Sequence, residues 1–318
     1  MKRPLVLLVI FTVLLTSSCT HKELDFGGVA DLTVLFDWSA VSDANPSSMM
    51  LSVFAGSSQP VFKPLQGKDG GGIMLPAGDY QLIGYNEDTE VLYTKGDKWG
   101  SFEICSQPTE FELKSRMFIR SRSVPRGAGT EDQQLIEEPD QLWTSVCEQA
   151  TVTGTVGRKV VMEMEKATFV LNFVIKNVDN IEYITDILAT VSGMSGSWIP
   201  AQHRCSDTEC LIPFQLSKKD DTFSGSVRTF GYRRTGSNGE AMKHLLVVYT
   251  EMTDGSRKYY TFDVSDGVNS ADPANGNRVE IVLEKMPVPK PMEKGAGFMT
   301  DVVDWEEVII PLKMSLTI

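Results

Sequence analysis

The fold class is decided by the stretch LLVVYTEMTDGSRKYYTFDV, residues 245–264. Two runs rich in apolar residues, 245–251 and 258–264, flank a polar centre that contains Asp254 and Gly255. Asp-Gly between such runs is the strongest short-range hairpin signal, because a two-residue turn takes positive φ at both central positions. The stretch therefore predicts two antiparallel strands joined by a tight turn.

Strand patterns continue on both sides of this hairpin. Apolar and polar positions alternate over residues 169–175 and again over 278–284, as in strands with one buried face and one wet face. No segment sustains a helical period. Further predicted strands, rich in β-branched and aromatic residues and bounded by turn residues, are Asp31 to Trp38, Met49 to Phe54, Tyr80 to Tyr85, Phe111 to Phe118 and 297–314.

The number and spacing of the strands predict an all-β protein built from two tandem antiparallel β-sandwiches. A chain of 318 residues is long enough for two domains at roughly 100 to 200 residues each. Residues 121–138 carry glycines and polar groups without an apolar pattern, which is typical of a linker. We therefore expect an N-terminal sandwich over residues 29–150 and a C-terminal sandwich over 151–318.

The N-terminus has the form of a signal peptide over residues 1–18. Two positive charges at Lys2 and Arg3 precede an apolar run, 5–15, which is too short to span a bilayer, since a spanning helix takes about twenty residues. Cys19 follows small polar residues and resembles the lipobox cysteine of bacterial lipoproteins, although Thr16 replaces the usual aliphatic residue. We expect cleavage before Cys19, acylation of Cys19, and a lipidated tether over 19–28. The alternative is an ordinary secreted protein in which Cys19 merely lies near the cut.

Four further cysteines lie in the exported part of the chain, and two interpretations of them stay open. In an oxidising compartment, Cys205 and Cys210 could form a disulfide around a short polar loop, with Cys105 and Cys147 as the other pair. Alternatively, all four are buried free thiols. Their spacing matches no zinc pattern, so no metal site is expected.

The inventory of catalytic residues is thin. The net charge of -12 disfavours nucleic acid as a partner. Neither His203 nor His244 lies in a strand-turn-helix elbow of the kind that holds a nucleophile. The oxygen-rich stretch 263–277 matches no calcium motif and is interpreted as a polar connection. We expect no enzymatic activity and no cofactor.

Tryptophans give a second functional hypothesis. Exposed aromatic rings can form a platform for sugars, although large aromatic residues are more often part of a core. On this basis the rival to an adhesion role is a glycan-binding lipoprotein of a saccharide-uptake system. The candidate rings are Trp38, Trp99, Trp143, Trp198 and Trp305.

Three short motifs resemble the fimbrillin-like lipoproteins of Bacteroides and relatives, and within them a family of unknown function. They are THKEL at 20–24, LPAGDYQLIGYN at 75–86, and DVVDWEEVIIPL at 301–312. The resemblance implies two tandem transthyretin-like or Ig-like β-sandwiches, export to the outer membrane on one face or the other, and a role in pilus assembly, anchoring or adhesion.

The resemblance also implies partners. In fimbrillins an N-terminal strand is removed by cleavage after an arginine, and a neighbouring subunit's strand fills the groove by β-augmentation. Here the first strand, 32–38, is followed by no arginine until Arg116. We therefore expect a tethered anchor, cap or adhesin that contacts the bilayer through acylated Cys19 and other pilus subunits by strand addition. The expected strand-exchange segment contains Val302, Trp305, Val308, Ile310 and Leu312.

Overall fold

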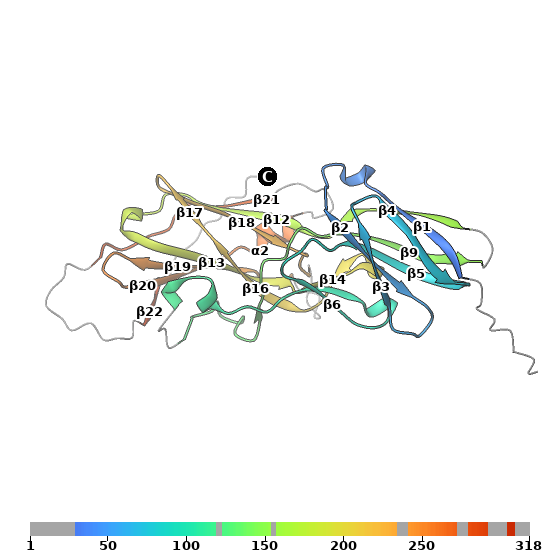
Figure 1. The fold of residues 1–318 in the computed structure, drawn as a ribbon. Helices are drawn as coiled ribbons and strands as arrows, with labels where there is room; N and C mark the ends of the chain where they lie inside the picture. Colours follow the sequence, from blue (N-terminus) through green and yellow to red (C-terminus); the bar gives the residue numbers. More distant parts are fainter. Residues whose placement is uncertain are drawn as a thin grey trace, which may run out of the picture.

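The computed structural model describes residues 29–118, 123–153, 157–233, 241–271, 279–291 and 304–308. Within them strands dominate, which confirms the all-β prediction, and the two sandwiches lie side by side along the long axis of the molecule (Figure 1). Helical structure in this part of the chain is confined to α2 (Ser265–Ser270) and to short 3-10 turns at Ser39–Val41, Trp99–Ser101, Phe111–Leu113, Arg116–Phe118, Ile181–Tyr183 and Pro200–Gln202.

The first sandwich packs a three-stranded sheet, ordered β10-β1-β4, against a five-stranded sheet, ordered β11-β9-β5-β2-β3. Alternate residues of each strand point into the core between the sheets, where Leu32, Leu51 and Leu82 are fully buried. Its strands are β1 (Val29–Asp37), β2 (Ser48–Phe54), β3 (Val61–Gln66), β4 (Gly70–Pro76), β5 (Gly78–Asn86), β9 (Trp143–Val152), β10 (Arg158–Glu163) and β11 (Glu165–Lys166).

The second sandwich packs a β17-β18-β12-β21 sheet against a β22-β20-β19-β13-β16-β8 sheet. The alternation predicted over residues 169–175 is confirmed, because Leu171, Phe173 and Ile175 are all fully buried. Its strands are β8 (Gln134–Leu135), β12 (Phe169–Ile175), β13 (Ile184–Ser195), β16 (Glu209–Gln215), β17 (Ser217–Lys219), β18 (Thr222–Thr229), β19 (Leu245–Met252), β20 (Arg257–Asp263), β21 (Val279–Leu283) and β22 (Trp305–Val308).

The predicted hairpin is present as β19 and β20, but its turn differs from the expected type. Gly255 has a φ of +83°, whereas Asp254 is not among the residues with positive φ. The N–H of Gly255 donates to the carbonyl of Met252 at 2.9 Å, and the N–H of Met252 donates to the carbonyl of Ser256 at 2.9 Å. This pattern is a type I turn closed by a glycine bulge, so only the glycine needs the left-handed conformation.

A fifth sheet, of four short strands, joins the two halves of the chain. This junction sheet has the order β15-β14-β7-β6, with β6 (Leu92–Lys95), β7 (Glu103–Ser106), β14 (Ser197–Ile199) and β15 (Arg204–Cys205). It covers the outer face of the five-stranded sheet, where Phe54 and Ile83 pack with Phe102 and Ile104. Two of its strands come from each half of the sequence, so the sandwiches share structure rather than only a linker.

The domain boundary expected near Thr151 requires correction. β9 runs through Thr151, and β10 then pairs in parallel with β1, for example Val160 opposite Val34. The chain therefore passes from the first sandwich to the second between Lys166 and Phe169. The physical reason is that β1 pairs with β4 on one side and with β10 on the other, and β10 lies beyond the predicted boundary.

The strand predicted over 111–118 and the linker predicted over 121–138 are also corrected. Residues 107–118 and 123–142 belong to a segment that leaves the first sandwich, packs on the second one and returns, and we call these residues the strap. Its two 3-10 turns bury Phe111, Met117 and Phe118, and β8 then pairs in parallel with β16. These buried residues do not follow a period of two, which is why no strand forms.

Candidate functional site

The expected strand-exchange segment is only partly within the described residues. Val302, Ile310 and Leu312 lie outside them, as does the lipidation candidate Cys19. Trp305 and Val308 lie on β22, the outermost strand of the six-stranded sheet. β22 pairs in parallel with β20, with Trp305 opposite Arg257 and Val308 opposite Tyr260. The strap and β22 therefore lie on the same sandwich.

Trp305 is held by an aromatic cluster rather than exposed. Its ring stacks on Phe118 of the strap with a centroid distance of 5.6 Å and an interplanar angle of 29°. It meets Tyr249 edge to face at 5.4 Å, and the guanidinium of Arg257 lies 5.9 Å from its centroid. Lys258 forms an ion pair with Glu306 beside it. Burial of the rings and the cation-π contact together fix β22 at the sheet edge.

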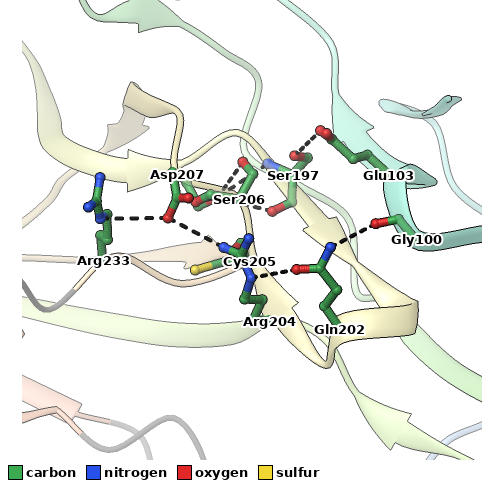
Figure 2. Close-up of polar contacts among 10 residues, drawn as sticks. Gly100, Glu103, Ser197, Gln202, Arg204, Cys205, Ser206, Asp207 and Arg233 are labelled. Carbon is green, nitrogen blue, oxygen red and sulfur yellow. Dashed lines mark hydrogen bonds and ion pairs between the residues drawn. The ribbon is translucent and has the colours of Figure 1, made fainter. Parts of the chain in front are cut away.

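A network of polar side chains locks the junction sheet (Figure 2). Ser195 Oγ lies 3.0 Å from Ser206 Oγ and donates to the carbonyl of Ser197 at 3.0 Å. Ser197 Oγ in turn donates to Glu103 Oε2 on β7 at 2.7 Å. Since Ser195, Ser197 and Ser206 are buried, each hydroxyl needs a partner, and these bonds supply it. The bond between Ser197 and Glu103 connects residues that are 94 positions apart in sequence.

The exposed rim of the junction carries a second set of contacts. Gln202 donates to the carbonyl of Gly100 at 2.7 Å and accepts from Arg204 Nε at 2.8 Å. Asp207 Oδ1 lies 3.3 Å from Arg204 Nη1 and 3.6 Å from Arg233 Nε. Figure 2 shows these groups turned toward one another along β15. The arrangement holds two loops together and contains no histidine beside a nucleophile.

The four cysteines in the described part of the chain are free thiols. Cys105 and Cys210 are buried, whereas Cys147 and Cys205 are half-buried, so the interpretation of four buried thiols holds for two of them. A Cys205–Cys210 disulfide is not formed. The sulfur of Cys205 faces Gly231, whereas that of Cys210 faces Gly196. Burial raises the pKa of Cys105 and of Cys210 to about 11, so both are protonated at neutral pH and unreactive.

The two described histidines are far from any catalytic arrangement. His203 is exposed, and its Nδ1 lies 2.7 Å from Glu165 Oε1. His244 is fully buried, with Nδ1 3.0 Å from the carbonyl oxygen of Ser192, and burial lowers its pKa. Within the described part of the chain, no group of three His, Cys, Asp or Glu side chains could hold a metal ion.

The tryptophans do not form a platform for sugars. Trp38 meets Trp143 edge to face at 6.1 Å inside the first sandwich, and Trp99 packs on Phe54 at 5.7 Å. Trp198 belongs to the junction core. With Trp305 in its own cluster, each of the five rings is at least half-buried.

Two grooves open on the surface that the sequence did not indicate. One, of about 380 Å³, lies on the second sandwich beside Lys114 and Glu138, and burial raises the pKa of Glu138. The other, of about 390 Å³, lies between β6 and the β2–β3 hairpin, with Met50 and Phe62 in its lining. Both need residues from separate elements, so no local sequence pattern could have revealed them.

The described residues include no helix that is long and apolar enough to cross a membrane. Over residues 18–215 the chain matches the profile of a family described as "Domain of unknown function (DUF5119)". The chain belongs to this family. The DUF5119 match begins beside the predicted lipidation site and includes the whole first sandwich and the junction sheet.

This DUF5119 protein is similar to a protein that is named as a fimbrial subunit. It is 20% identical over 287 residues to "Putative fimbrium anchoring subunit Fim4B" of Bacteroides ovatus, covering 84% of this chain and 80% of the relative. A crystal structure described as a "putative adhesin", also from Bacteroides ovatus, aligns with a TM-score of 0.62 at 20% identity, over 84% of this chain and 94% of that one.

A second similar structure, described as "putative polysaccharide binding proteins (DUF1812)" from Bacteroides thetaiotaomicron, has a TM-score of 0.50 at 13% identity. It covers 81% of this chain and 90% of that one. At these identities the two structural matches establish the fold. Together with the curated relative, they confirm the resemblance to fimbrillin-like proteins of the Bacteroides group and the β-sandwich architecture.

Proposed function

We propose that this protein is a non-enzymatic surface lipoprotein that acts in the anchoring or assembly of a pilus, or in adhesion. The observation that carries the proposal is the match to a fimbrium anchoring subunit over 84% of the chain, which includes both sandwiches. A match confined to one sandwich would support only a shared domain.

The position of β1 supports an anchoring role. β1 is the central strand of its sheet, paired on one side with β4 and on the other with β10. Removing it would break two ladders and take Leu32 and Val34, which are fully buried, out of the core of the sandwich. Together with the absence of arginine between residues 38 and 116, this arrangement suits a subunit that keeps its first strand.

Attachment to the outer membrane would come from acylated Cys19. The chain enters β1 at Val29, so residues 19–28 would form a short tether between lipid and sandwich. Contact with other pilus subunits would come from strand addition at the far end, where β22 forms the outer edge of its sheet among the described strands. β1, which would follow the tether, and β22 lie on different sandwiches, so the two attachments would be separated.

The experiment compares a deletion strain complemented with wild-type protein or with Cys19→Ala. We expect the deletion to reduce surface fibres or adherence, wild type to restore them, and Cys19→Ala to release the protein from the outer-membrane fraction without restoration. Labelling with a fatty acid analogue should mark wild type only. Intact fibres and adherence in the deletion strain would contradict the proposal, if the protein from wild-type outer membranes is also recovered as an unassociated monomer.

The glycan-binding alternative has less support. Its basis in the sequence is five tryptophans, and all five rings pack against other side chains. The description that mentions polysaccharide binding belongs to a structure that is 13% identical to this chain. The match to that structure therefore establishes only the fold.

A further inference from the structure

β6 has an open edge. It is the outermost strand of the junction sheet and pairs only with β7 in the described part of the chain. Next to it, the N–H of Gln107 donates to the carbonyl of Val91 at 2.9 Å. Antiparallel partners alternate between bonded and non-bonded pairs. Because Val91 and Gln107 form a bonded pair, the pairs Leu92–Ser106 and Thr94–Ile104 are non-bonded. The N–H and C=O groups of Leu92 and Thr94 therefore point away from β7, toward the groove.

The groove beside this edge can receive apolar side chains. Its lining includes Met50 on β2, Tyr85 on β5 and Ile104 on β7, from the two sheets that pack there. Phe62 adds a ring that is 45% exposed, one of the few large apolar side chains on the surface. The volume of about 390 Å³ lies in the range of ordinary ligand pockets.

One end of the groove is acidic. Glu87 lines it, and Asp88 and Glu90 follow in the same loop. Asp140 is also at this end, where its carboxylate accepts the N–H groups of Glu90 and Val91 at 2.7 and 2.9 Å. Glu87 and Glu90 are exposed, so a positively charged group of a partner can reach them.

The neighbouring edge strand β3 is protected, in contrast to β6. The N–H of Gly67 donates to the carbonyl of Ser47 at 3.2 Å, which places Pro64, opposite Met50, at an outward position. Proline has no donor, and proline on an edge strand discourages pairing with another chain. β6 carries no proline, and its outward groups at Leu92 and Thr94 remain available.

We infer that the β6 edge and its groove bind an extended polypeptide whose alternate side chains are apolar and which carries a lysine or arginine at the end near Glu87. Main-chain bonds to Leu92 and Thr94 would give affinity, and the groove would select the apolar positions. A polypeptide fits better than a glycan because the distinctive feature is a row of backbone donors and acceptors in strand geometry. The inference adds a binding site to the proposed function. It rests on that function in one respect, namely that the partner is another surface subunit.

The experiment measures peptide binding to the full-length chain in detergent by fluorescence anisotropy. The probes are synthetic heptapeptides in which three valines alternate with threonine, with a lysine at one end or the other. Their isomers with three consecutive valines serve as controls. We expect the alternating peptides to bind at least tenfold more tightly than the isomers, and the preferred lysine position to show whether the peptide runs parallel or antiparallel to β6.

Three variants locate the binding. Thr94→Pro removes an outward N–H and should weaken binding at least tenfold, whereas the matched control Thr94→Val keeps the N–H and should bind like wild type. Phe62→Ala should weaken binding, and Glu87→Gln should reduce its salt dependence. Circular dichroism and thermal melting check that each variant is folded.

Equal binding of alternating and consecutive peptides, or equal binding to folded Thr94→Pro, would overturn the inference. So would a lack of peptide binding at millimolar concentration, or binding of glycans alone on an array. The peptide assay reads only the groove, whereas fibres in the deletion strain read the assembly role. Failure of one is therefore distinguishable from failure of the other.

Discussion

His244 is the residue whose environment most clearly ties chemistry to stability. Its ring is fully buried, meets Tyr232 edge to face at 5.1 Å, and has Nδ1 beside the carbonyl oxygen of Ser192. A carbonyl accepts, so Nδ1 carries the proton of a neutral imidazole. Burial lowers the pKa of His244, and it outweighs the hydrogen bonds with Ser192 and Asn269 and the charge of Asp263, which favour the charged form.

The lowered pKa predicts a loss of stability in mild acid. Below pH 6.5 the unfolded chain binds a proton at His244 that the folded chain does not. The free energy of unfolding should therefore fall as pH drops from about 6.5 toward the folded pKa, by up to about 1.4 kcal/mol per pH unit. Urea denaturation at pH 7.5, 6.5 and 5.5 measures it. His244→Gln should flatten this slope, whereas His203→Gln, on the surface, should not; an unchanged slope in His244→Gln would refute the assignment.

Residue patterns in the sequence predicted which side chains are buried better than which side chains meet. The alternation at 169–175 was sufficient to assign a buried face, because the period of two is local. The contacts of Cys205, Cys210 and His244 depend on strands far apart in sequence, so spacing alone left their roles open. The tryptophans behaved similarly, since core packing was expected but their partners were not.

At the scale of elements, the β19–β20 hairpin depends on its glycine. Gly255 has φ +83°, where a Cβ costs about 1 to 2 kcal/mol. Gly255→Ala should therefore lower the free energy of unfolding by about 1 kcal/mol, and Gly255→Asn by less, because asparagine tolerates this region better. Chemical denaturation measures both. Asp254→Ala serves as the comparison for the neighbouring position, and an alanine at 255 without cost would rule out the proposed turn.

β22 depends on Trp305. The ring supplies the contacts with Phe118, Tyr249 and Arg257, and parallel pairing with β20 contributes less per residue than antiparallel pairing. Trp305→Ala should release β22 while leaving the rest of the sheet folded. Hydrogen exchange at 304–308 should then increase by at least tenfold. Glu306→Gln, which removes only an exposed ion-pair partner of Lys258, should change it little; similar exchange in Trp305→Ala would contradict this account.

Several strands were predictable from the sequence because each carries its own pattern. β1, β2, β5, β12 and the β19–β20 hairpin all lie close to their predicted positions. The junction sheet was not predicted, since its strands are short and pair across the two halves of the chain. The strap was misassigned because its apolar residues are placed by the second sandwich rather than by a local period.

At the scale of the molecule, the strap and the junction sheet couple the two sandwiches. Phe118 is fully buried against the second sandwich, although the strap begins and ends in the first. We therefore expect one cooperative unfolding transition. Phe118→Ala should lower the free energy of unfolding by about 3 to 5 kcal/mol and keep the transition single. Calorimetry and circular dichroism measure it, and two resolved transitions in wild type would count against coupling.

The predicted fold of two sandwiches is confirmed, whereas the predicted boundary near Thr151 is wrong because β10 pairs with β1. Two sandwiches were expected from the length and the strand spacing, whereas the return of β9, β10 and β11 to the first sandwich has no local signal. The grooves share this property, because each lies where distant elements meet. The single sequence therefore predicts the architecture of this chain. It does not predict the features that form by pairing between distant parts of the chain.

The central position of β1 also has a mechanical consequence. In the lipid-anchored subunit that we propose, tension under flow would enter at Val29 and run along β1. The ladders to β4 and β10 would then be loaded in shear, and their bonds would have to break together. An edge strand pulled from one end would instead unzip bond by bond. Single-molecule pulling from residue 29 should therefore show a higher rupture force than pulling from residue 308 on β22, and the opposite order would disprove it. The strand that begins the fold would then be the part that resists being pulled off the cell.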